Sequence, residues 1–454
     1  MTIAAISTPA GTGAIAIVRL SGCDAKLIAE RFVKPLYDRR ATYSTFVAGG
    51  EAIDEVVATY YRAPHSYTGD DTVEIACHGS LYIQQTILQE LINAGARLAE
   101  AGEFTQRAFL NGRLNLSQAE AVADLISSTS EASNRLAMSQ LRGGYQQQLR
   151  AMRQELLDLT ALLELELDFS EEDLEFADRS RLMQLTQNIE NEARHLVESF
   201  RSGNAVKNGV KVAIVGAPNA GKSTLLNALI GDDRAIVSDI PGTTRDTIED
   251  TIVIDGILVR FIDTAGLRQS DDPIEAEGIR RSQKAAREAD VVVYLLDATS
   301  DSMSPSDLHI DTLTQSPNQA PGISGNLILA LNKCDLRCDL DTVKQEFSTL
   351  GGQFPIEAIS AKLGTGLNKL KRAIVEPFKT KGETAVLTNM RHYDAMRHLL
   401  EAIIQVRHGL DSQIPTDLVA IDLRDAIHQI GTITGEVTTD EILGTIFSRF
   451  CIGK

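Results

Sequence analysis

The chain has 454 residues, and 44 Lys and Arg against 62 Asp and Glu give it a formal charge of −18. This length predicts about three domains, and 43% hydrophobic with 23% charged residues excludes a disordered or fibrous chain. No apolar run is long enough to span a bilayer, and the N-terminus lacks the pattern of a signal peptide. We therefore expect a cytoplasmic protein with no membrane segment, whose scattered cysteines are reduced thiols.

The first part of the chain mixes short β-rich runs with one helical stretch. Residues 14–20, 56–61 and 72–76 have the composition of strands, and residues 83–94 have that of a helix. Gly and Pro residues separate these runs. The sequence therefore predicts an N-terminal α+β domain over residues 1–116.

The next part has the three- and four-residue apolar spacing of helices. Ser117, followed by Glu120, has the pattern of a capping box and predicts a helix start at Ser117. Leucines at 156, 159, 163 and 167 form one apolar stripe, and a second stripe runs from 182 to 200. The segment SGNAVKNG, residues 202–209, is predicted to break this second helix.

An α/β pattern follows from Lys211 to about Phe378, and the helical spacing then returns. The simplest interpretation is one all-α helical domain, residues 117–208 and 380–454, split in sequence by an inserted α/β domain, residues 209–379. Both junctions are short and polar, as domain boundaries tend to be. The predicted fold class is multidomain: α+β, all-α and inserted α/β.

A β-branched run at 211–215 leads into GAPNAGKST, which matches the phosphate-binding loop GxxxxGKS from Gly216 to Ser223. Such a loop wraps phosphates with backbone N–H groups and aims a helix N-terminus at them. Lys222 is expected to contact the β- and γ-phosphates, and Ser223 a Mg²⁺ ion. Alone, the match could also be a fortuitous Gly-rich turn.

Three further motifs follow in the order found in P-loop GTPases. DTAG ends a hairpin predicted at 248–262 with an Asp255-Gly256 turn, and NKCD and SAK each follow a predicted strand. The Asp335 carboxylate can accept from two donors of guanine that adenine does not offer, which favours GTP. The predicted GTP-binding residues are Asn219, Ala220, Gly221, Lys222, Ser223, Thr224, Ser238, Thr243, Thr244, Asp263, Thr264, Ala265, Gly266, Asn332, Lys333, Asp335, Ser360, Ala361 and Lys362.

Leu267 follows DTAG, where Ras-like enzymes carry the glutamine that orients the attacking water. Another group must therefore stabilise the charge on the leaving phosphate. A monovalent cation, K⁺, beside the phosphates could do so, while Thr244 joins Ser223 at Mg²⁺. From spacing alone, Asn219 could equally stabilise only the loop geometry. The expected K⁺ ligands are Asn219, Ser238, Ile240 and Thr243.

The motifs PNAGKS, IPGTTRD, DTAGLR, NKxD and SAK resemble the TrmE-Era-EngA-like class of GTPases. GTGAIAIVRLSG, RAFLNGRLNLSQAEA and the terminal FCIGK extend the resemblance over the whole chain to the MnmE (TrmE) family of tRNA uridine modification GTPases. It implies a hydrolase acting on GTP, dependent on K⁺ and accelerated when two G domains meet. It also implies that a glutamate, here Glu275, orients the water, although by composition Glu275 is one of several acids at a helix start.

The resemblance further implies that the N-terminal domain binds a reduced folate, 5,10-methylene- or 5-formyl-tetrahydrofolate. A C-terminal tail folded toward this site would present the thiol of Cys451 to the one-carbon unit, so Cys451 joins Glu275 as a candidate catalytic residue. The alternatives are that Cys451 is an inert small hydrophobe and that Arg19 and Glu74 are ordinary surface charges. The residues that match the family's folate contacts are Arg19, Glu74, Arg113 and Lys454.

By the same resemblance the chain is a homodimer through its N-terminal domain and forms a heterotetramer with an FAD- and NADH-dependent partner of the MnmG (GidA) type. Together they are expected to add a carboxymethylaminomethyl or aminomethyl group to C5 of the wobble uridine, U34, of tRNA. The sequence carries no GxGxxG fingerprint after a strand, so the flavin is expected on the partner. One other interpretation stays open, a ribosome-assembly or signalling GTPase that acts as a binding switch, whereas NKCD nearly excludes an ATP-using P-loop protein.

Overall fold

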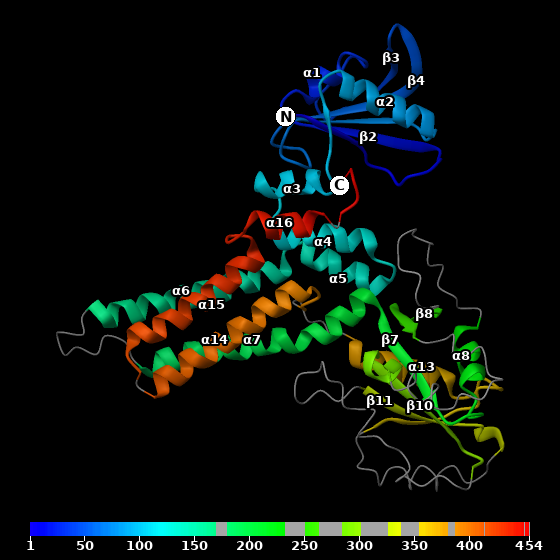
Figure 1. Cartoon of the computed structure of the whole chain (residues 1–454), viewed down its shortest axis with the longest axis vertical. Helices are drawn as coiled ribbons and strands as arrows, with labels where there is room; N and C mark the ends of the chain where they lie inside the picture. Colours follow the sequence, from blue (N-terminus) through cyan, green and yellow to red (C-terminus); the bar gives the residue numbers. More distant parts are fainter. Residues whose placement is uncertain are drawn as a thin grey trace. The chain divides into compact units, whose positions relative to one another are not determined.

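The computed structural model describes residues 1–168, 179–231, 250–262, 284–300, 326–336, 354–379, 386–412, 414–448 and 450–453. The chain forms two compact units (Figure 1). The first consists of Met1–Ile126, Ser139–Ala193 and Asp394–Lys454, and the second of Ser127–Met138 and Arg194–Tyr393. Within the described ranges, no helix combines the length and the apolar character that crossing a membrane requires.

The N-terminal part of the first unit is a six-stranded sheet in the order β3-β4-β5-β2-β1-β6. One face packs against α2, with Leu20, Ile75 and Ile87 in a shared core. Arg19 and Glu74 lie on the opposite face, because side chains alternate along a strand. The predicted strands and helix are confirmed. The elements are β1 (Ile3–Ile6), β2 (Ile15–Ser21), α1 (Ala25–Ala29), β3 (Thr42–Ala48), β4 (Glu51–Tyr61), β5 (Thr72–His78), α2 (Leu81–Asn93) and β6 (Arg97–Leu98).

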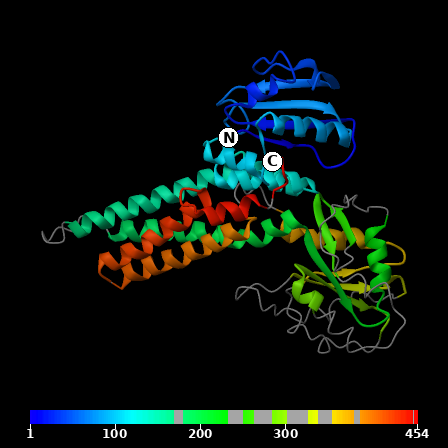
Figure 2. The same ribbon diagram turned by 45° about the horizontal axis from the view of Figure 1, so that its top comes forward.

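Helices make up the rest of the first unit, in which α6, α15 and parts of α7 and α14 lie side by side (Figures 1 and 2). The predicted stripe is confirmed where it is described, because Leu156, Leu159 and Leu163 are fully buried. The helices of the chain's helical parts are α3 (Glu103–Leu110), α4 (Leu116–Ser127), α5 (Glu131–Leu141), α6 (Gly144–Asp168), α7 (Arg179–Asn208), α14 (Met390–Asp411), α15 (Thr416–Thr434) and α16 (Asp440–Phe447).

The predicted start of α4 at Ser117 is wrong. Asn115 caps the helix instead: its Oδ1 accepts from the Gln118 N–H at 2.9 Å, and Gln118 Oε1 accepts from the Asn115 N–H at 3.1 Å. This reciprocal pair is a capping box two residues earlier in the chain. Ser117 lies inside the first turn, where its hydroxyl donates to Asn115 Oδ1.

The predicted break at residues 202–209 is also wrong, because α7 continues to Asn208. Gly209, with a φ of 89°, follows the last helical residue. Gly203 is tolerated inside the helix for a tertiary reason: a Cβ there would lie 2.1 Å from the carbonyl oxygen of Leu387. The glycine thus allows the backbone that precedes α14 to approach the helix.

The second unit contains a six-stranded sheet in the order β12-β11-β10-β7-β9-β8. All neighbours are parallel except β8 and β9, which form the predicted hairpin with Asp255 and Gly256 at positive φ. Helices α8 and α13 pack against this sheet in one core, which confirms the α/β fold. The elements are β7 (Val210–Gly216), α8 (Lys222–Ile230), β8 (Asp250–Ile254), β9 (Ile257–Phe261), β10 (Val291–Asp297), β11 (Asn326–Asn332), η3 (Cys334–Leu336), β12 (Ile356–Ala358), α13 (Leu367–Val375) and η4 (Glu376–Phe378).

Candidate functional site

The loop between β7 and α8 depends on two glycines. A Cβ at Gly216 would lie 2.4 Å from the Leu295 carbonyl oxygen, and one at Gly221 would lie 2.4 Å from Asn332 Nδ2. Gly221 also has a φ of 96°, which disfavours other residues. The loop is therefore pressed against β10 and β11 at the carboxyl ends of the parallel strands, where open α/β sheets bind their ligands.

Lys222, at the start of α8, is aimed back over this loop. Its Nζ donates to the carbonyl oxygens of Gly216 and Ala217, each at 2.9 Å. Burial lowers the pKa of the lysine below its usual value. A phosphate at this position would meet the lysine together with the backbone N–H groups of the loop and the N-terminus of α8.

Asn332 joins three of the predicted nucleotide motifs. This buried side chain donates from Nδ2 to the Ala220 carbonyl at 2.8 Å, and its Oδ1 accepts from the Ala361 N–H at 3.0 Å. The GKS loop, the NKCD segment and the SAK segment are therefore held together by one side chain. Ser360 is buried beside it, and its N–H donates to Thr365.

The NKCD and SAK segments also carry exposed polar side chains. Asp335, in η3, and Lys362 are exposed. Lys333 has a φ of 63°, and its Nζ forms an ion pair with Asp297 at the end of β10. Burial alone would raise the pKa of Asp297, but hydrogen bonds from Lys333 and Thr299 outweigh it and hold that pKa below its usual value. The NKCD segment is thereby fixed to the neighbouring strand.

Several predicted site residues lie outside the described residues. Their roles stay predictions. They are Ser238, Ile240, Thr243, Thr244, Asp263, Thr264, Ala265, Gly266, Glu275 and Lys454.

A second group of predicted residues meets on the face of the N-terminal sheet opposite α2. Arg19 and Glu74 are direct cross-strand partners, with Nε and Nη2 of the arginine at 2.9 and 2.8 Å from Glu74 Oε1. The rings of Tyr67 and Phe104 flank the guanidinium, with centroids 5.3 and 5.6 Å from Cζ. Both aromatic contacts are of cation–π type. Arg113 lies against the same loop as Tyr67, since a Cβ at Gly69 would be 3.2 Å from its Cγ.

The C-terminal tail packs beside this group. Ile452 forms a β-bridge with Ala101, and Ser7 Oγ donates to the Gly453 carbonyl at 3.1 Å. A Cβ at Gly453 would lie 2.2 Å from the Ile6 carbonyl, so the tail fits closely against the end of β1. Ala5, the residue before Ile6, is the cross-strand partner of Arg19. Cys451, within the tail, is exposed.

Sequence reasoning missed Tyr67, Phe104 and Asp297. Asp297 ends an apolar strand just as the NKCD segment follows one, so its position at the same sheet edge could have been inferred. Tyr67 and Phe104 carry no such signal, because only the folded loop and α3 bring them to Arg19.

Comparison with known proteins agrees with this architecture. The family model described as "MnmE helical domain" matches residues 116–451, and "GTP-binding protein TrmE N-terminus" matches residues 2–113. The curated tRNA modification GTPase MnmE of Parabacteroides distasonis is 50% identical, and the alignment covers 100% of both chains. The MnmE of Porphyromonas gingivalis is 47% identical over 100% of this chain and 98% of its own.

Among solved structures, the G domain of the FeoB iron transporter of T. maritima is 27% identical over 37% of this chain and 99% of its own, with a TM-score of 0.24. The two family models together, and each relative by itself, cover both the N-terminal and the helical parts, with the nucleotide motifs inside the matched range. This chain therefore belongs to the MnmE family of tRNA modification GTPases.

Proposed function

We propose that this enzyme hydrolyses GTP in a K⁺-dependent reaction and, with an FAD-dependent partner of the MnmG type, adds a carboxymethylaminomethyl or aminomethyl group to C5 of the wobble uridine, U34, of tRNA. A reduced folate is the proposed one-carbon donor. Family membership supports GTP hydrolysis and the role in tRNA modification. The observation that carries the folate part is the packing of the C-terminal tail at the end of β1, beside the Arg19–Glu74 pair.

The described part of the nucleotide site supports the binding of GTP and Mg²⁺. The loop from Asn219 to Thr224 offers backbone N–H groups and the N-terminus of α8, and Lys222 adds a positive charge. Ser223, in the first turn of α8, and Thr244 are the proposed Mg²⁺ ligands. Asp335 is the proposed acceptor for the guanine N1–H and amine, while Asn332 holds the surrounding segments in place.

A bound K⁺ would supply positive charge at the point where negative charge grows on the phosphates. Asn219 fits this role because it lies at the exposed tip of the loop, in the left-handed region with a φ of 63°. The other proposed K⁺ ligands are Ser238, Ile240 and Thr243. Glu275 is the proposed residue that orients the attacking water.

The chemistry of the N-terminal group fits a reduced folate. Glu74 can accept from the donors of a pterin, and the arginines can pair with the carboxylates of its glutamate tail. Arg19 is held in one orientation by Glu74 and two aromatic rings. Arg113 and Lys454 are the further proposed contacts, and Cys451 is the candidate residue that acts on the one-carbon unit.

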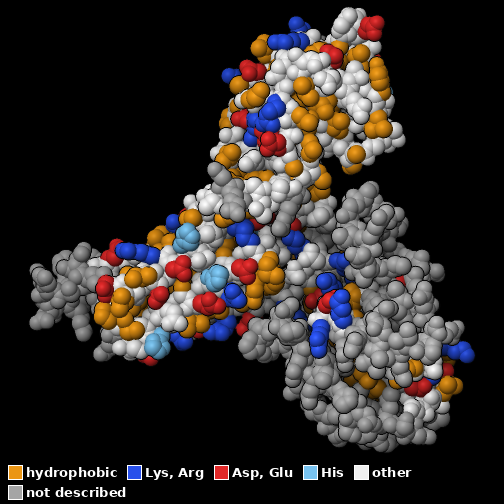
Figure 3. Space-filling view, in the orientation of Figure 1, with side chains coloured by type: hydrophobic (Ala, Val, Ile, Leu, Met, Phe, Trp, Pro, Cys, Tyr) orange, Lys and Arg blue, Asp and Glu red, His pale blue; other side chains and the backbone are white. Residues whose placement is uncertain are grey.

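The proposed homodimer is supported by an apolar row on the sheet face that carries Arg19 and Glu74. Tyr43, Val57, Ala76 and Ile17 are cross-strand neighbours on adjacent strands, and Tyr43 and Val57 are 71% and 40% exposed. On the face drawn in Figure 3, other hydrophobic side chains of this N-terminal part are exposed as well. A second copy of the chain would cover this row. The proposed domains remain 1–116, 117–208, 209–379 and 380–454.

Mass spectrometry of wobble uridines tests the proposed function. A strain that lacks the gene should contain unmodified uridine at position 34 of its substrate tRNAs, and the wild-type chain should restore the modification. A Glu74→Ala variant should restore little, although it should still hydrolyse GTP. Normal wobble uridines in the deleted strain would favour instead a GTPase that acts only as a binding switch.

A further inference from the structure

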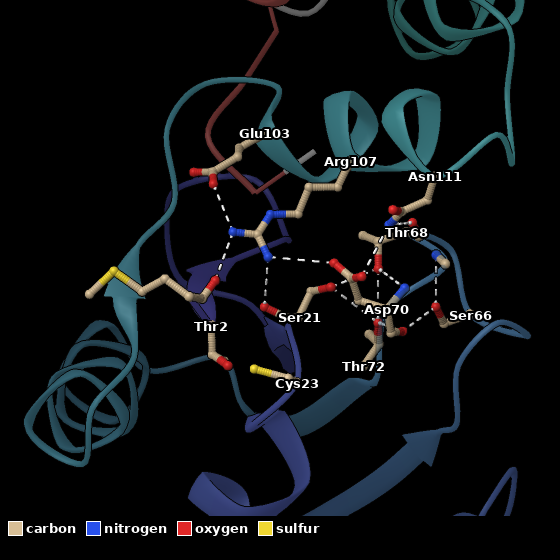
Figure 4. A network of polar contacts seen from close by, with 12 residues as sticks. Thr2, Ser21, Cys23, Ser66, Thr68, Asp70, Thr72, Glu103, Arg107 and Asn111 are labelled. Atoms are coloured by element: carbon tan, nitrogen blue, oxygen red, sulfur yellow. Dashed lines mark hydrogen bonds and ion pairs between the residues drawn. The ribbon is translucent and has the colours of Figure 1, made fainter.

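Arg107, on α3, connects four parts of the N-terminal region (Figure 4). Its Nη2 donates to the Met1 carbonyl at 2.9 Å and to Glu103 Oε1 at 3.0 Å. Its Nη1 donates to the Ser21 carbonyl at 3.3 Å and pairs with Asp70 Oδ2 at 3.5 Å. The side chain is only 17% exposed. A planar guanidinium with five donors suits such a junction, which a lysine could fill only in part.

Asp70 belongs to the loop of residues 62–71, and α3 holds this loop at a second point. Asn111 Nδ2 donates to the Thr68 carbonyl at 2.8 Å and to Asp70 Oδ1 at 3.1 Å. Inside the loop, Ser66 Oγ donates to the Asp70 carbonyl, and Thr68 Oγ1 lies 2.6 Å from Ser21 Oγ. The loop is therefore tied both to α3 and to the end of β2.

This loop places Tyr67 next to Arg19. Its hydroxyl lies 2.8 Å from Thr105 Oγ1 on α3, and its ring lies over the guanidinium of Arg19. Phe104, also on α3, contacts the same guanidinium. Helix α3 thus supplies one of the two rings directly and fixes the other through the loop.

We propose that Arg107 is a positioning residue of the reduced-folate site. By holding Asp70 it keeps Tyr67 over Arg19, and Arg19 then stays paired with Glu74 before the ligand arrives. A free arginine side chain has many conformations. Because Arg19 is confined to one of them before the folate binds, binding loses less side-chain entropy. This inference rests on the proposed folate function and gives Arg107 no direct contact with the folate.

The chain offers a matched control in Arg97. Its Nη2 pairs with the same oxygen, Glu103 Oε1, at 2.6 Å. The other described contacts of its side chain are with Leu98 and Glu100. Arg97→Lys therefore perturbs the shared carboxylate without touching the loop that carries Tyr67.

The first measurement is equilibrium dialysis of the full chain with 5-formyltetrahydrofolate. Arg107→Lys is expected to bind about tenfold more weakly than the wild type, a change of about 1.4 kcal/mol, and Arg97→Lys within about twofold of it. Asp70→Asn should reproduce the Arg107→Lys effect, and the double variant should be no worse than either single variant, because both break the same link. All variants should hydrolyse GTP at the wild-type rate.

The second measurement reports the position of the loop without any folate. The chain contains no tryptophan, so Tyr67→Trp introduces a single tryptophan at the site, whose emission can be excited apart from that of the tyrosines. In that background, Arg107→Lys should shift the emission to the red and increase quenching by acrylamide, whereas Arg97→Lys should change neither. If Arg107 only stabilised another part of the molecule, neither the emission of the tryptophan at position 67 nor its quenching would change.

The outcomes distinguish a failure of the positioning role of Arg107 from a failure of the proposed folate function. If the wild type binds the folate and Arg107→Lys binds it equally well, the positioning role is overturned. Weaker binding with unchanged fluorescence also overturns it, because the loop has then not moved. If the wild type does not bind the folate, the proposed folate function fails, and Arg107 is left without a site to position.

Discussion

The nucleotide site and the N-terminal site differ in how the chain assembles them. At the nucleotide site, short motifs at the ends of neighbouring parallel strands are joined by one buried side chain, Asn332. At the N-terminal site, the contact between Ser7 and Gly453 joins residues 446 positions apart. The first site is thus specified mainly by local patterns, while the second depends on contacts that form only when both ends of the chain have folded. A substitution that disables one site should therefore leave the other site functional.

The largest expected effect is that of Lys222→Ala, which should impair the nucleotide site and not the N-terminal site. Lys222→Ala removes the charge over the loop, and GTP turnover should fall by about 10² to 10³-fold. The affinity for 5-formyltetrahydrofolate should stay unchanged. Lys369→Ala, at an exposed position of α13, is the control and should retain turnover. If Lys222→Ala abolished folate binding as well, the two sites would not be independent.

A smaller effect tests whether α5 belongs with the second unit. The Ala132 N–H, in the first turn of α5, donates to the Gly256 carbonyl at 3.0 Å. Proline is tolerated in a first helical turn but has no N–H. Ala132→Pro should therefore lower the free energy of unfolding of this unit by about 1 kcal/mol, as measured with urea.

Glu131→Pro is the matched control for that experiment, because it places proline one residue earlier and leaves the Gly256 contact in place. The exposed ion pair that Glu131 forms with Arg135 contributes little. Equal losses of stability in the two proline variants would show that the contact between α5 and the β8–β9 hairpin does not stabilise the unit.

The smallest expected effect concerns the pH dependence of the Asp297–Lys333 pair. The pKa of Asp297 is lowered in the folded chain, so its contribution to stability is present above the unfolded pKa, about 3.9. It is lost as the pH falls through the lower folded pKa. Because the pair is partly exposed, Asp297→Asn should cost at most about 1 kcal/mol near neutral pH.

Urea unfolding at several pH values checks this prediction. The difference between wild type and Asp297→Asn should shrink as the pH falls below about 4. Glu288→Gln, which removes a carboxylate from an exposed pair with Lys284, should show a smaller difference throughout. A difference for Asp297→Asn that grows on acidification would have the wrong sign and would rule out the pair as its cause.

The same contrast explains what could be predicted from the sequence. The hairpin turn at Asp255-Gly256 and the strands before NKCD and SAK were predictable, because turn chemistry and apolar runs are local. The helix start at Ser117 was wrong since Asn115 with Gln118 forms an equally good capping pair. The break expected near Gly203 was wrong for a tertiary reason, the close approach of Leu387.

The surroundings of Arg19 could not be predicted in this way. Arg19 and Glu74 were assigned to a folate site by family resemblance. Their pairing arises from the register of β2 and β5, which is fixed by the packing of the opposite face against α2. Tyr67 and Phe104 reach Arg19 from a loop and a helix whose spacing in the chain carries no sign of the contact.

Folate binding by the full chain tests the central claim most directly: that the N-terminal sheet and the C-terminal tail form one reduced-folate site. In equilibrium dialysis, the wild type should bind 5-formyltetrahydrofolate. Glu74→Ala and Gly453→Val should each bind at least about tenfold more weakly, with GTP turnover unchanged. Equal binding by all three proteins, or no binding by the wild type, would contradict the account.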